Sequence, residues 1–309
     1  MRPTCGERAR GSAGNMRVLV TGLSGFTGWH LATTLQNAGY EVLGLGSEAS
    51  SIVPRYLRAD LNETARIAAW LSEVQPTHVI HLAALSHVVG DAIDFYRVNV
   101  LGTESLLQAV VDADIAPQKI VIASSANIYG NAQTNPITEA TAIRPINHYG
   151  VSKAAMELML CKWQQRLPII ATRPFNYTGP GQSDRFVFAK IVAAFRERAK
   201  IITLGNINVS RDLSEVRYVA DIYRRLMECE HRDIVVNICS GKPVSILEAI
   251  DIMEGIAGYR PDIEIDPALV RPNEIITLSG DTTYLRKLLG DVVPIDISRT
   301  LQDMYETQA

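Results

Sequence analysis

Short apolar runs alternate with segments of helical periodicity over the first half of the chain. The run RVLVT at Arg17–Thr21 is rich in β-branched residues and ends at glycines, which predicts a buried strand. Thr27–Ala38 instead repeats apolar residues at helical spacing and is stopped by Gly39. The same criteria predict strands at 41–45, 78–83, 119–123 and 168–172, and helices at 62–74, 95–113 and 147–166.

This order of elements predicts the fold class. The strands are apolar almost throughout, as expected when both faces of a parallel sheet are covered by helices. Right-handed crossovers then limit the topology, so we expect an α/β fold with a Rossmann-type, doubly wound parallel sheet.

The rhythm changes after Arg173, where prolines and glycines gather in RPFNYTGPG. Further on, helices are predicted at 186–200, 219–228 and 245–256, and short strands at 201–204, 235–238 and 275–278. We expect a Rossmann-type domain at 16–173 and a smaller C-terminal α/β substrate lobe at 174–309. Residues 1–15 contain charges and glycines but no apolar stretch, so we interpret them as a flexible extension or leader outside the fold.

Composition excludes several classes of function. The 309 residues carry a net charge of −3, so no basic field favours nucleic acid. The longest apolar runs are far shorter than the roughly 20 residues that cross a bilayer, so no membrane partner is expected. The four cysteines are scattered without a C-x-x-C pair, which favours a reducing compartment, the cytoplasm. The six histidines show no metal-binding spacing, and no metal is expected.

A glycine-rich turn follows the first strand directly. In VTGLSGFTG, Gly22, Gly25 and Gly28 form the pattern G-x-x-G-x-x-G ahead of a predicted helix. Glycines let the chain turn sharply and let its backbone approach a pyrophosphate, while the free N–H groups of the helix face the anion. The segment therefore predicts a dinucleotide-binding turn, although a glycine triplet alone also occurs in plain strand–helix turns.

Tyr149 and Lys153 form a Y-x-x-x-K motif within a predicted helix. Residues four apart lie on the same helical face, and an ammonium beside a phenol lowers the pKa of the phenol. Tyr149 is therefore a candidate general acid/base. Ser125 lies in SSANIYG, just after the predicted strand 119–123, at the carboxyl end where ligands of open α/β sheets bind.

These motifs, together with HLAA at His81–Ala84 and NVLGT at Asn99–Thr103, resemble the extended short-chain dehydrogenase/reductases, also called the NAD-dependent epimerase/dehydratase family. The resemblance implies that Ser125, Tyr149 and Lys153 are catalytic, and that Asn99 is structural. It also implies a set of cofactor-binding residues besides Tyr149 and Lys153: Gly22, Gly25, Phe26, Thr27, Gly28, Ser47, Asp60, Leu61, Leu82, Ala83 and Ala84.

The end of the second strand bears on the choice of cofactor. NAD-preferring relatives carry Asp at the position of Gly46, where a carboxylate would accept hydrogen bonds from the ribose and repel a 2′-phosphate. Ser47 could donate to a 2′-phosphate, with Arg55 or Arg58 as counter-charge, whereas Glu48 argues mildly the other way. We expect NADP(H) to be favoured, with NAD(H) as the alternative.

The C-terminal lobe resembles the branch of this family that acts on GDP-mannose derivatives. The similar segments are RPFNYTGPGQ, RFVFAKI, SRD and RPNE. By that resemblance the lobe binds a nucleotide diphosphate sugar, with GDP favoured. The implied contacts are Asn176, Lys190 and Arg211 with the diphosphate, and Arg271 and Glu274 with the nucleotide. Ser125 and Asn127 are expected in the sugar pocket, as is His87, which follows the cofactor segment at the same edge of the sheet. The alternative for any one of these residues taken alone is an ordinary surface ion pair.

One departure separates two activities of this branch. Dehydratases carry Glu at the position of Asn127, and an amide cannot exchange a proton near neutral pH. Glu139 lies in a loop shared by many relatives and is not credited as a replacement. We therefore predict NAD(P)H-dependent reduction of the C4 keto group of a GDP-4-keto-6-deoxy-mannose-type sugar, giving GDP-rhamnose or its C4 epimer.

Other activities are weighed against this one. A nucleotide-sugar 4-epimerase with retained NAD⁺ would use the same triad, and a GDP-mannose 4,6-dehydratase is a weaker alternative. A catalytically inactive NADP sensor or scaffold has no reason to keep Ser125, Tyr149 and Lys153 together. The long helices 95–113 and 147–166 correspond to the pair that forms a four-helix interface in this family, so we expect a homodimer.

Overall fold

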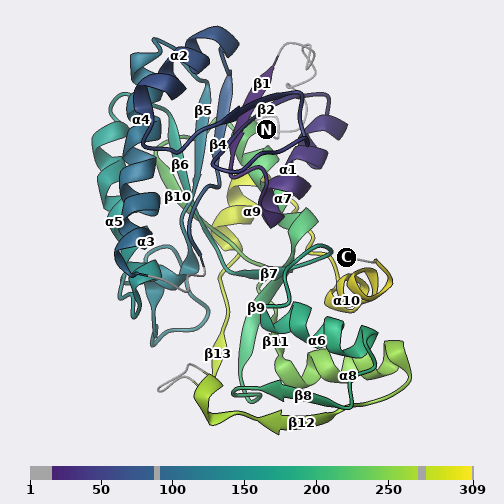
Figure 1. Ribbon diagram of the computed structural model, residues 1–309. Helices are drawn as coiled ribbons and strands as arrows, with labels where there is room; N and C mark the ends of the chain where they lie inside the picture. Colours follow the sequence, from purple (N-terminus) through teal and green to yellow (C-terminus); the bar gives the residue numbers. More distant parts are fainter. Residues whose placement is uncertain (1–15, 87–90, 271–275, 308–309) are drawn as a thin grey trace.

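The large domain is built on one seven-stranded sheet whose paired strands all run parallel (Figure 1). The computed structural model describes residues 16–86, 91–270 and 276–307. The sheet order is β10-β6-β5-β4-β1-β2-β3. Its strands are β1 (Arg17–Thr21), β2 (Glu41–Gly46), β3 (Arg55–Arg58), β4 (His78–His81), β5 (Lys119–Ala123), β6 (Ile169–Pro174) and β10 (Ile234–Ile238). The order reverses between β1 and β4, which confirms the predicted doubly wound sheet.

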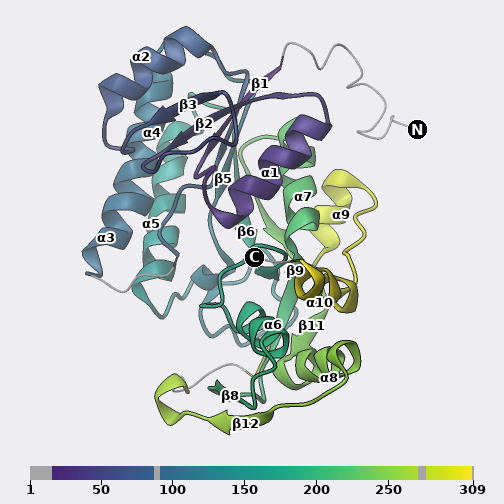
Figure 2. The same cartoon turned by 45° about the vertical axis from the view of Figure 1, so that its right-hand side comes forward.

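Helices cover both faces of this sheet (Figure 2). Alternate strand residues supply the two cores: Val18 and Val20 pack on one side, and Leu19 packs on the other. The first side carries α1 (Phe26–Asn37), α7 (Val216–Glu228) and α9 (Thr283–Leu289); the second carries α2 (Thr64–Val74), α4 (Gly102–Asp112) and α5 (His148–Trp163).

The predicted helix 95–113 is interrupted. It consists of α3 (Ile93–Tyr96), a π-helical turn (Arg97–Leu101) and α4. The π-turn carries Asn99, whose side chain accepts from the backbone N–H of Leu85 at 2.8 Å and donates to the Leu85 carbonyl at 3.1 Å. This irregular turn, which periodicity does not reveal, therefore anchors the segment that follows β4.

The smaller lobe lies beyond the carboxyl ends of the strands, reached directly from β6 (Figure 1). Strand β9 (Ser210–Glu215) pairs with β7 (Asn176–Thr178), β11 (Pro243–Ser245) and β13 (Thr277–Leu278), while β8 (Ile201–Leu204) pairs with β12 (Asp262–Ile265). Helices α6 (Val187–Arg196), α8 (Ile246–Ala257) and α10 (Ile297–Glu306) pack on these strands around a core that includes Ile191, Phe195 and Leu301.

The chain does not stay in this lobe after residue 174. Strand β10 was expected in the C-terminal lobe, but it pairs parallel with β6 at the edge of the large sheet, where Val236 joins the main core. Helices α7 and α9 also pack on the large sheet. A short apolar strand does not reveal which sheet it joins, so a linear boundary at residue 174 is wrong for these segments. That the segments forming the β7, β9, β11 and β13 sheet make up a separate substrate lobe stays a proposal.

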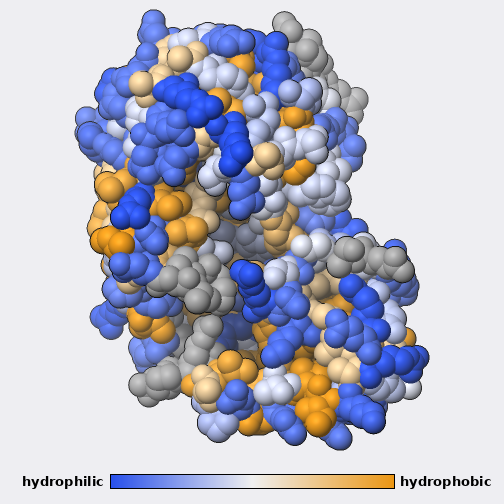
Figure 3. All heavy atoms as spheres, in the orientation of Figure 1, coloured by the Kyte–Doolittle hydropathy of each residue, from blue (hydrophilic) through white to orange (hydrophobic). Residues whose placement is uncertain are grey.

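Figure 3 shows a hollow between the large domain and the lobe. The turns that follow β1, β4 and β5 open toward the lobe, because the carboxyl ends of parallel strands meet at one edge. Within the described ranges, no helix has the length and apolarity that a membrane span requires.

Candidate active site

The glycine-rich turn lies at the point where the strand order reverses. Gly22 has φ +71°, and a Cβ on it would lie 2.8 Å from the backbone N of Ala83. A Cβ on Gly28 would lie 2.3 Å from the carbonyl O of Gly22. Both positions therefore require glycine. Gly25 caps α1 with no side-chain hydrogen bond, and the first turn of α1 holds no acidic residue among those described, so its N–H groups suit a pyrophosphate.

A buried hydrogen-bonded chain fixes the neighbouring segment after β4. His81 Nδ1 lies 2.6 Å from Thr21 Oγ1, and His81 Nε2 lies 2.9 Å from Thr103 Oγ1. Burial lowers the pKa of His81 to about 3, so this imidazole is neutral and positions structure rather than exchanging protons. Thr21 Oγ1 also accepts from the N–H of Ala83 at 3.2 Å. The predicted cofactor segment, Leu82–Ala84, is thereby held against Gly22.

The two candidate arginines on β3 lie at opposite ends of that strand. Arg58 pairs in register with Gly46, and its Nε donates to the Ser47 carbonyl at 3.1 Å. Arg55 pairs with Leu43 and forms a 3.6 Å ion pair with Glu41 at the far end. The structure thus brings Arg58, and not Arg55, to the carboxyl edge beside Ser47.

Asp60 and Leu61 lead from β3 into α2. The Asp60 carboxylate accepts from the N–H of Asn62 at 2.9 Å and from its side-chain amide at 2.8 Å. Leu61 is buried, and a Cβ on Gly102 would lie 3.0 Å from its Cδ1. The two residues shape this turn, and their contact with adenine stays a prediction.

Ser125 and Tyr149 come together from different elements. Ser125 caps a 3₁₀ turn (Ala126–Tyr129), and its Oγ accepts from the backbone N–H of Asn127 at 3.1 Å and from the Asn127 amide at 3.0 Å. Tyr149 lies in the first turn of α5, behind the Asn147 cap. Burial raises the pKa of Tyr149 to about 12, and a hydrogen bond with Ser125 opposes this rise. A Cβ on Gly150 would lie 2.7 Å from the Asn127 carbonyl O, so glycine allows the two elements to touch.

Lys153 lies one helical turn beyond Tyr149 and is itself buried. Its Nζ donates to the Ala123 carbonyl at 2.6 Å. Burial lowers the pKa of Lys153 to about 8, and the negative charge of Glu157 acts in the opposite direction. The sequence argument predicts a Tyr149 pKa lowered toward neutrality, but in this structure burial dominates at Tyr149 and raises that pKa.

A buried polar network behind the triad was missed by sequence reasoning. Arg173 Nη2 lies 2.6 Å from Glu157 Oε2, and Arg173 Nη1 donates to the Tyr129 hydroxyl at 2.9 Å. The Tyr129 hydroxyl donates to Asn237 Oδ1 at 2.7 Å, and the backbone N–H of Asn237 donates to Glu139 Oε1 at 2.8 Å. The guanidinium therefore ties the 3₁₀ turn that begins at Ser125 to the helix that carries Tyr149 and Lys153.

The lobe also touches the glycine-rich turn directly. The hydroxyls of Thr27 and Tyr177 lie 2.8 Å apart, and the rings of Phe26 and Tyr177 stack with centroids 6.2 Å apart. His30 Nε2 lies 2.9 Å from the Pro180 carbonyl. Tyr177 was not predicted as a site residue, although it lies inside the quoted RPFNYTGPG segment.

The predicted substrate residues are only partly brought together. Asn176 and Arg211 lie on the adjacent strands β7 and β9. Arg211 Nη1 donates to the Ser210 carbonyl at 2.9 Å, and Lys190 Nζ donates to the Thr203 carbonyl at 2.7 Å. Their contacts with a diphosphate stay predictions. Three predicted residues lie outside the described part of the chain: His87, Arg271 and Glu274.

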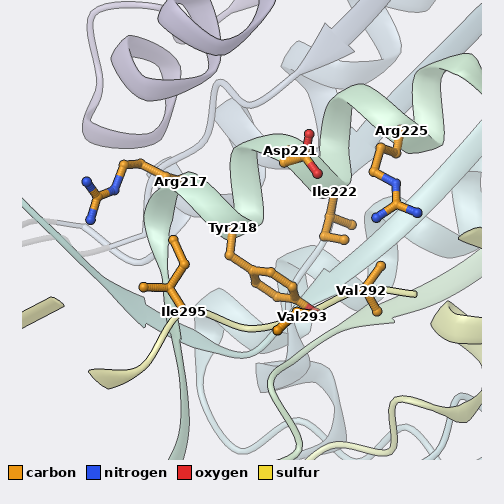
Figure 4. A pocket seen from close by; sticks show the side chains of 8 residues that line it. All are labelled: Arg217, Tyr218, Asp221, Ile222, Arg225, Val292, Val293 and Ile295. Atoms are coloured by element: carbon orange, nitrogen blue, oxygen red, sulfur yellow. The ribbon is translucent and has the colours of Figure 1, made fainter. Parts of the chain in front are cut away.

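Another hollow, between α7 and residues 292–295, contains none of the predicted site residues (Figure 4). Its charged side chains already have partners. Arg217 pairs with Glu215 and Asp303, and Asp221 pairs with Arg224. We interpret this hollow as a gap in surface packing.

Comparisons with known proteins identify the family of this chain. The model of the family described as GDP-mannose 4,6 dehydratase matches residues 19–304. A GDP-6-deoxy-D-talose 4-dehydrogenase from Aggregatibacter actinomycetemcomitans is 33% identical, over 95% of this chain and 98% of its own length. A GDP-6-deoxy-D-mannose reductase from Pseudomonas aeruginosa is also 33% identical, and the match covers 93% of this chain and 95% of that protein. The structure of RMD from Pseudomonas aeruginosa, complexed with NADPH, superposes with a TM-score of 0.83 at 32% identity, covering 94% of this chain and 97% of that chain.

Proposed function

We propose that this chain, which belongs to the GDP-mannose 4,6-dehydratase family of extended short-chain dehydrogenase/reductases, reduces the C4 keto group of a GDP-4-keto-6-deoxy-mannose-type sugar with NAD(P)H. The family resemblance predicted from the motifs is thereby confirmed. Family members act on nucleotide sugars as 4-keto reductases, dehydratases or epimerases, so the proposal concerns which of these reactions this site performs.

The observation that carries the proposal is Asn127. Its side-chain amide donates to Ser125 Oγ, at the position where the dehydratases that this segment resembles carry Glu. Dehydration needs a base for the C5 proton and an acid for the C6 hydroxyl, and an amide supplies neither. The carboxylate of Glu139 accepts from the backbone N–H of Asn237, and the Glu139 backbone carbonyl accepts from Arg173 Nη1. These contacts favour a site without dehydration chemistry.

Reduction needs one proton donor, and Tyr149 supplies it. With its pKa raised to about 12, the phenol holds its proton at neutral pH and can donate it to the alkoxide formed at C4. Ser125 Oγ, which hydrogen-bonds Tyr149, orients the carbonyl oxygen beside this proton. A bound nicotinamide dinucleotide would supply the hydride. This dinucleotide would be held by the glycine-rich turn, by Leu82–Ala84 and by Lys153.

Two further details belong to the proposal. NADP(H) is favoured because Arg58 and Ser47 lie together at the end of β2, and a similar structure is complexed with NADPH. The named relatives include both a 6-deoxy-mannose reductase and a 6-deoxy-talose dehydrogenase, so either configuration at C4 is a candidate product. The similarity to the 6-deoxy-talose dehydrogenase makes GDP-6-deoxy-talose the alternative product to GDP-rhamnose.

Incubation with NADPH and GDP-4-keto-6-deoxy-mannose tests the proposal. Mass spectrometry should show a gain of two mass units in the sugar, matched one to one by NADPH consumed, and NMR of the product gives the C4 configuration. Tyr149→Phe is the control for non-enzymatic reduction. Interconversion of C4 epimers without net consumption of NADPH would support a 4-epimerase instead.

A further inference from the structure

A tyrosine on β3 covers the glycine face of β2 beside the phosphate-binding turn. A Cβ on Gly44 would lie 2.3 Å from Tyr56 Cδ2, and a Cβ on Gly46 would lie 2.5 Å from Tyr56 Oη. The side chain therefore spans both glycines along one face of the strand, with the ring over Gly44 and the hydroxyl over Gly46. This is also the face of Val42, which packs in the core that includes α1. Tyr56 has no role in the catalytic site described above.

The Tyr56 side chain is held at both ends. Its hydroxyl donates to the Glu48 carbonyl at 2.6 Å and hydrogen-bonds Ser24 in the phosphate-binding turn. Its ring packs against the core beside Val53. Displacing it costs two hydrogen bonds and packing, unlike displacement of the free end of a flexible side chain.

We propose that Tyr56 determines the choice of cofactor, because it occupies the space over Gly46 that a ribose-binding carboxylate would need. The inference rests on the proposed use of a nicotinamide dinucleotide and not on the identity of the sugar. NAD recognition at this point requires an acid whose side chain accepts from the ribose hydroxyls. With Tyr56 present, that side chain has no room at residue 46.

The same tyrosine fixes the turn that would meet a 2′-phosphate. By binding the Glu48 carbonyl, it holds the exposed residues Ser47 and Glu48 in place at the end of β2. Arg58 holds the other side of this turn through the Ser47 carbonyl, and its exposed guanidinium supplies positive charge. Glu48 is the opposing charge near Tyr56, so Arg58 and Ser47 must outweigh it for NADPH to be preferred.

Equilibrium binding of NADPH and NADH, followed by fluorescence without sugar, tests this role. Gly46→Asp alone should weaken NADPH at least about tenfold without tightening NADH, because the new side chain meets Tyr56. Gly46→Asp with Tyr56→Val should bind NADH about tenfold more tightly than the single variant, which corresponds to one well-placed hydrogen bond to a charged acceptor. Thermal melting confirms that each variant is folded.

Two arginine variants and one conservative variant complete the design. Arg58→Gln should weaken NADPH about tenfold and change NADH less than about twofold, whereas Arg55→Gln, at the other end of the strand, should change neither. Tyr56→Phe removes only the hydroxyl and should reduce the NADPH preference at least about threefold.

The outcomes separate this inference from the proposed function. A parent protein that binds neither dinucleotide would refute the proposed function. A parent that binds NADH more tightly, a Gly46→Asp variant that gains NADH as strongly as the double variant, or a preference unchanged in Tyr56→Phe would refute the role of Tyr56 alone.

Discussion

Removing the charge of Glu157 should destabilise the protein and shift its activity along the pH axis. Both side chains of the Arg173–Glu157 pair are 6% exposed, and the guanidinium makes three contacts with the carboxylate of 3.1 Å or less. Breaking a buried pair on one side costs about 3–5 kcal/mol. The amide introduced by Glu157→Gln would still accept one hydrogen bond, so we expect about 3 kcal/mol, at the lower end of that range.

The shift in melting temperature follows from this value. A loss of about 3 kcal/mol in a large domain lowers the melting temperature by roughly 6 °C. The matched control is Glu254→Gln, which breaks an exposed pair with Arg260 on the lobe surface and should change the melting temperature by at most about 2 °C. Differential scanning fluorimetry measures both variants.

A purely structural role for Glu157 would not move the pH profile. The negative charge of Glu157 raises the pKa of Lys153, which burial otherwise lowers to about 8. Without this charge Lys153 loses its proton at lower pH, so the basic limb of the rate profile should move to lower pH. Glu157→Gln with an unchanged melting temperature and an unchanged basic limb would refute the reasoning on both counts. A limb that moved to higher pH would refute the electrostatic part.

Three other substitutions test separate parts of the account. Tyr149→Phe should retain NADPH binding and lower turnover by about 10²–10⁴-fold, and unchanged turnover would remove Tyr149 from the mechanism. Gly28→Ala places a Cβ 2.3 Å from the Gly22 carbonyl and should weaken NADPH binding at least about tenfold in a titration. Gly255→Ala, whose Cβ would meet no atom within 4 Å other than those of its own helix backbone, should have no effect. Two apolar side chains are exposed on this side of the large domain: Leu101, just before α4, at 56%, and Leu158, in α5, at 71%. Figure 3 shows an apolar surface there. Leu158→Glu should therefore convert the expected homodimer to monomers, as measured by sedimentation. A parent protein that is monomeric at micromolar concentration would contradict the dimer.

Sequence patterns predicted the parts of the fold that depend on local periodicity. The strand at Arg17–Thr21 and the glycines that follow it were predictable because a buried parallel strand is apolar throughout and a tight turn against Ala83 excludes any side chain. The placement of β10 was not predictable, because its pairing with β6 is a tertiary choice between two sheets. The π-turn at Asn99 depends on hydrogen bonds to Leu85, fourteen residues away, which no local pattern encodes.

The candidate site divides in the same way. Ser125 and Tyr149 were predictable as a pair because each lies in a recognisable motif, SSANIYG for Ser125 and Y-x-x-x-K for Tyr149. The link between their two elements through Arg173 was not, because Glu157, Tyr129 and Arg173 are far apart in sequence and look like ordinary core and surface residues. The electrostatics also depend on burial: the spacing of Tyr149 and Lys153 suggested a lowered phenol pKa, and desolvation reverses that direction.

The most direct test of the central claim is a deuterium-transfer experiment that separates reduction from dehydration. With GDP-4-keto-6-deoxy-mannose and NADPH deuterated at nicotinamide C4 on the transferred side, the account predicts a product with one deuterium at sugar C4 for each NADPH consumed. With GDP-mannose and NADP⁺, it predicts no keto sugar, because Asn127 supplies neither the base nor the acid for loss of water. A 4-keto-6-deoxy sugar formed from GDP-mannose would contradict the account and turn attention to Glu139 as the missing carboxylate.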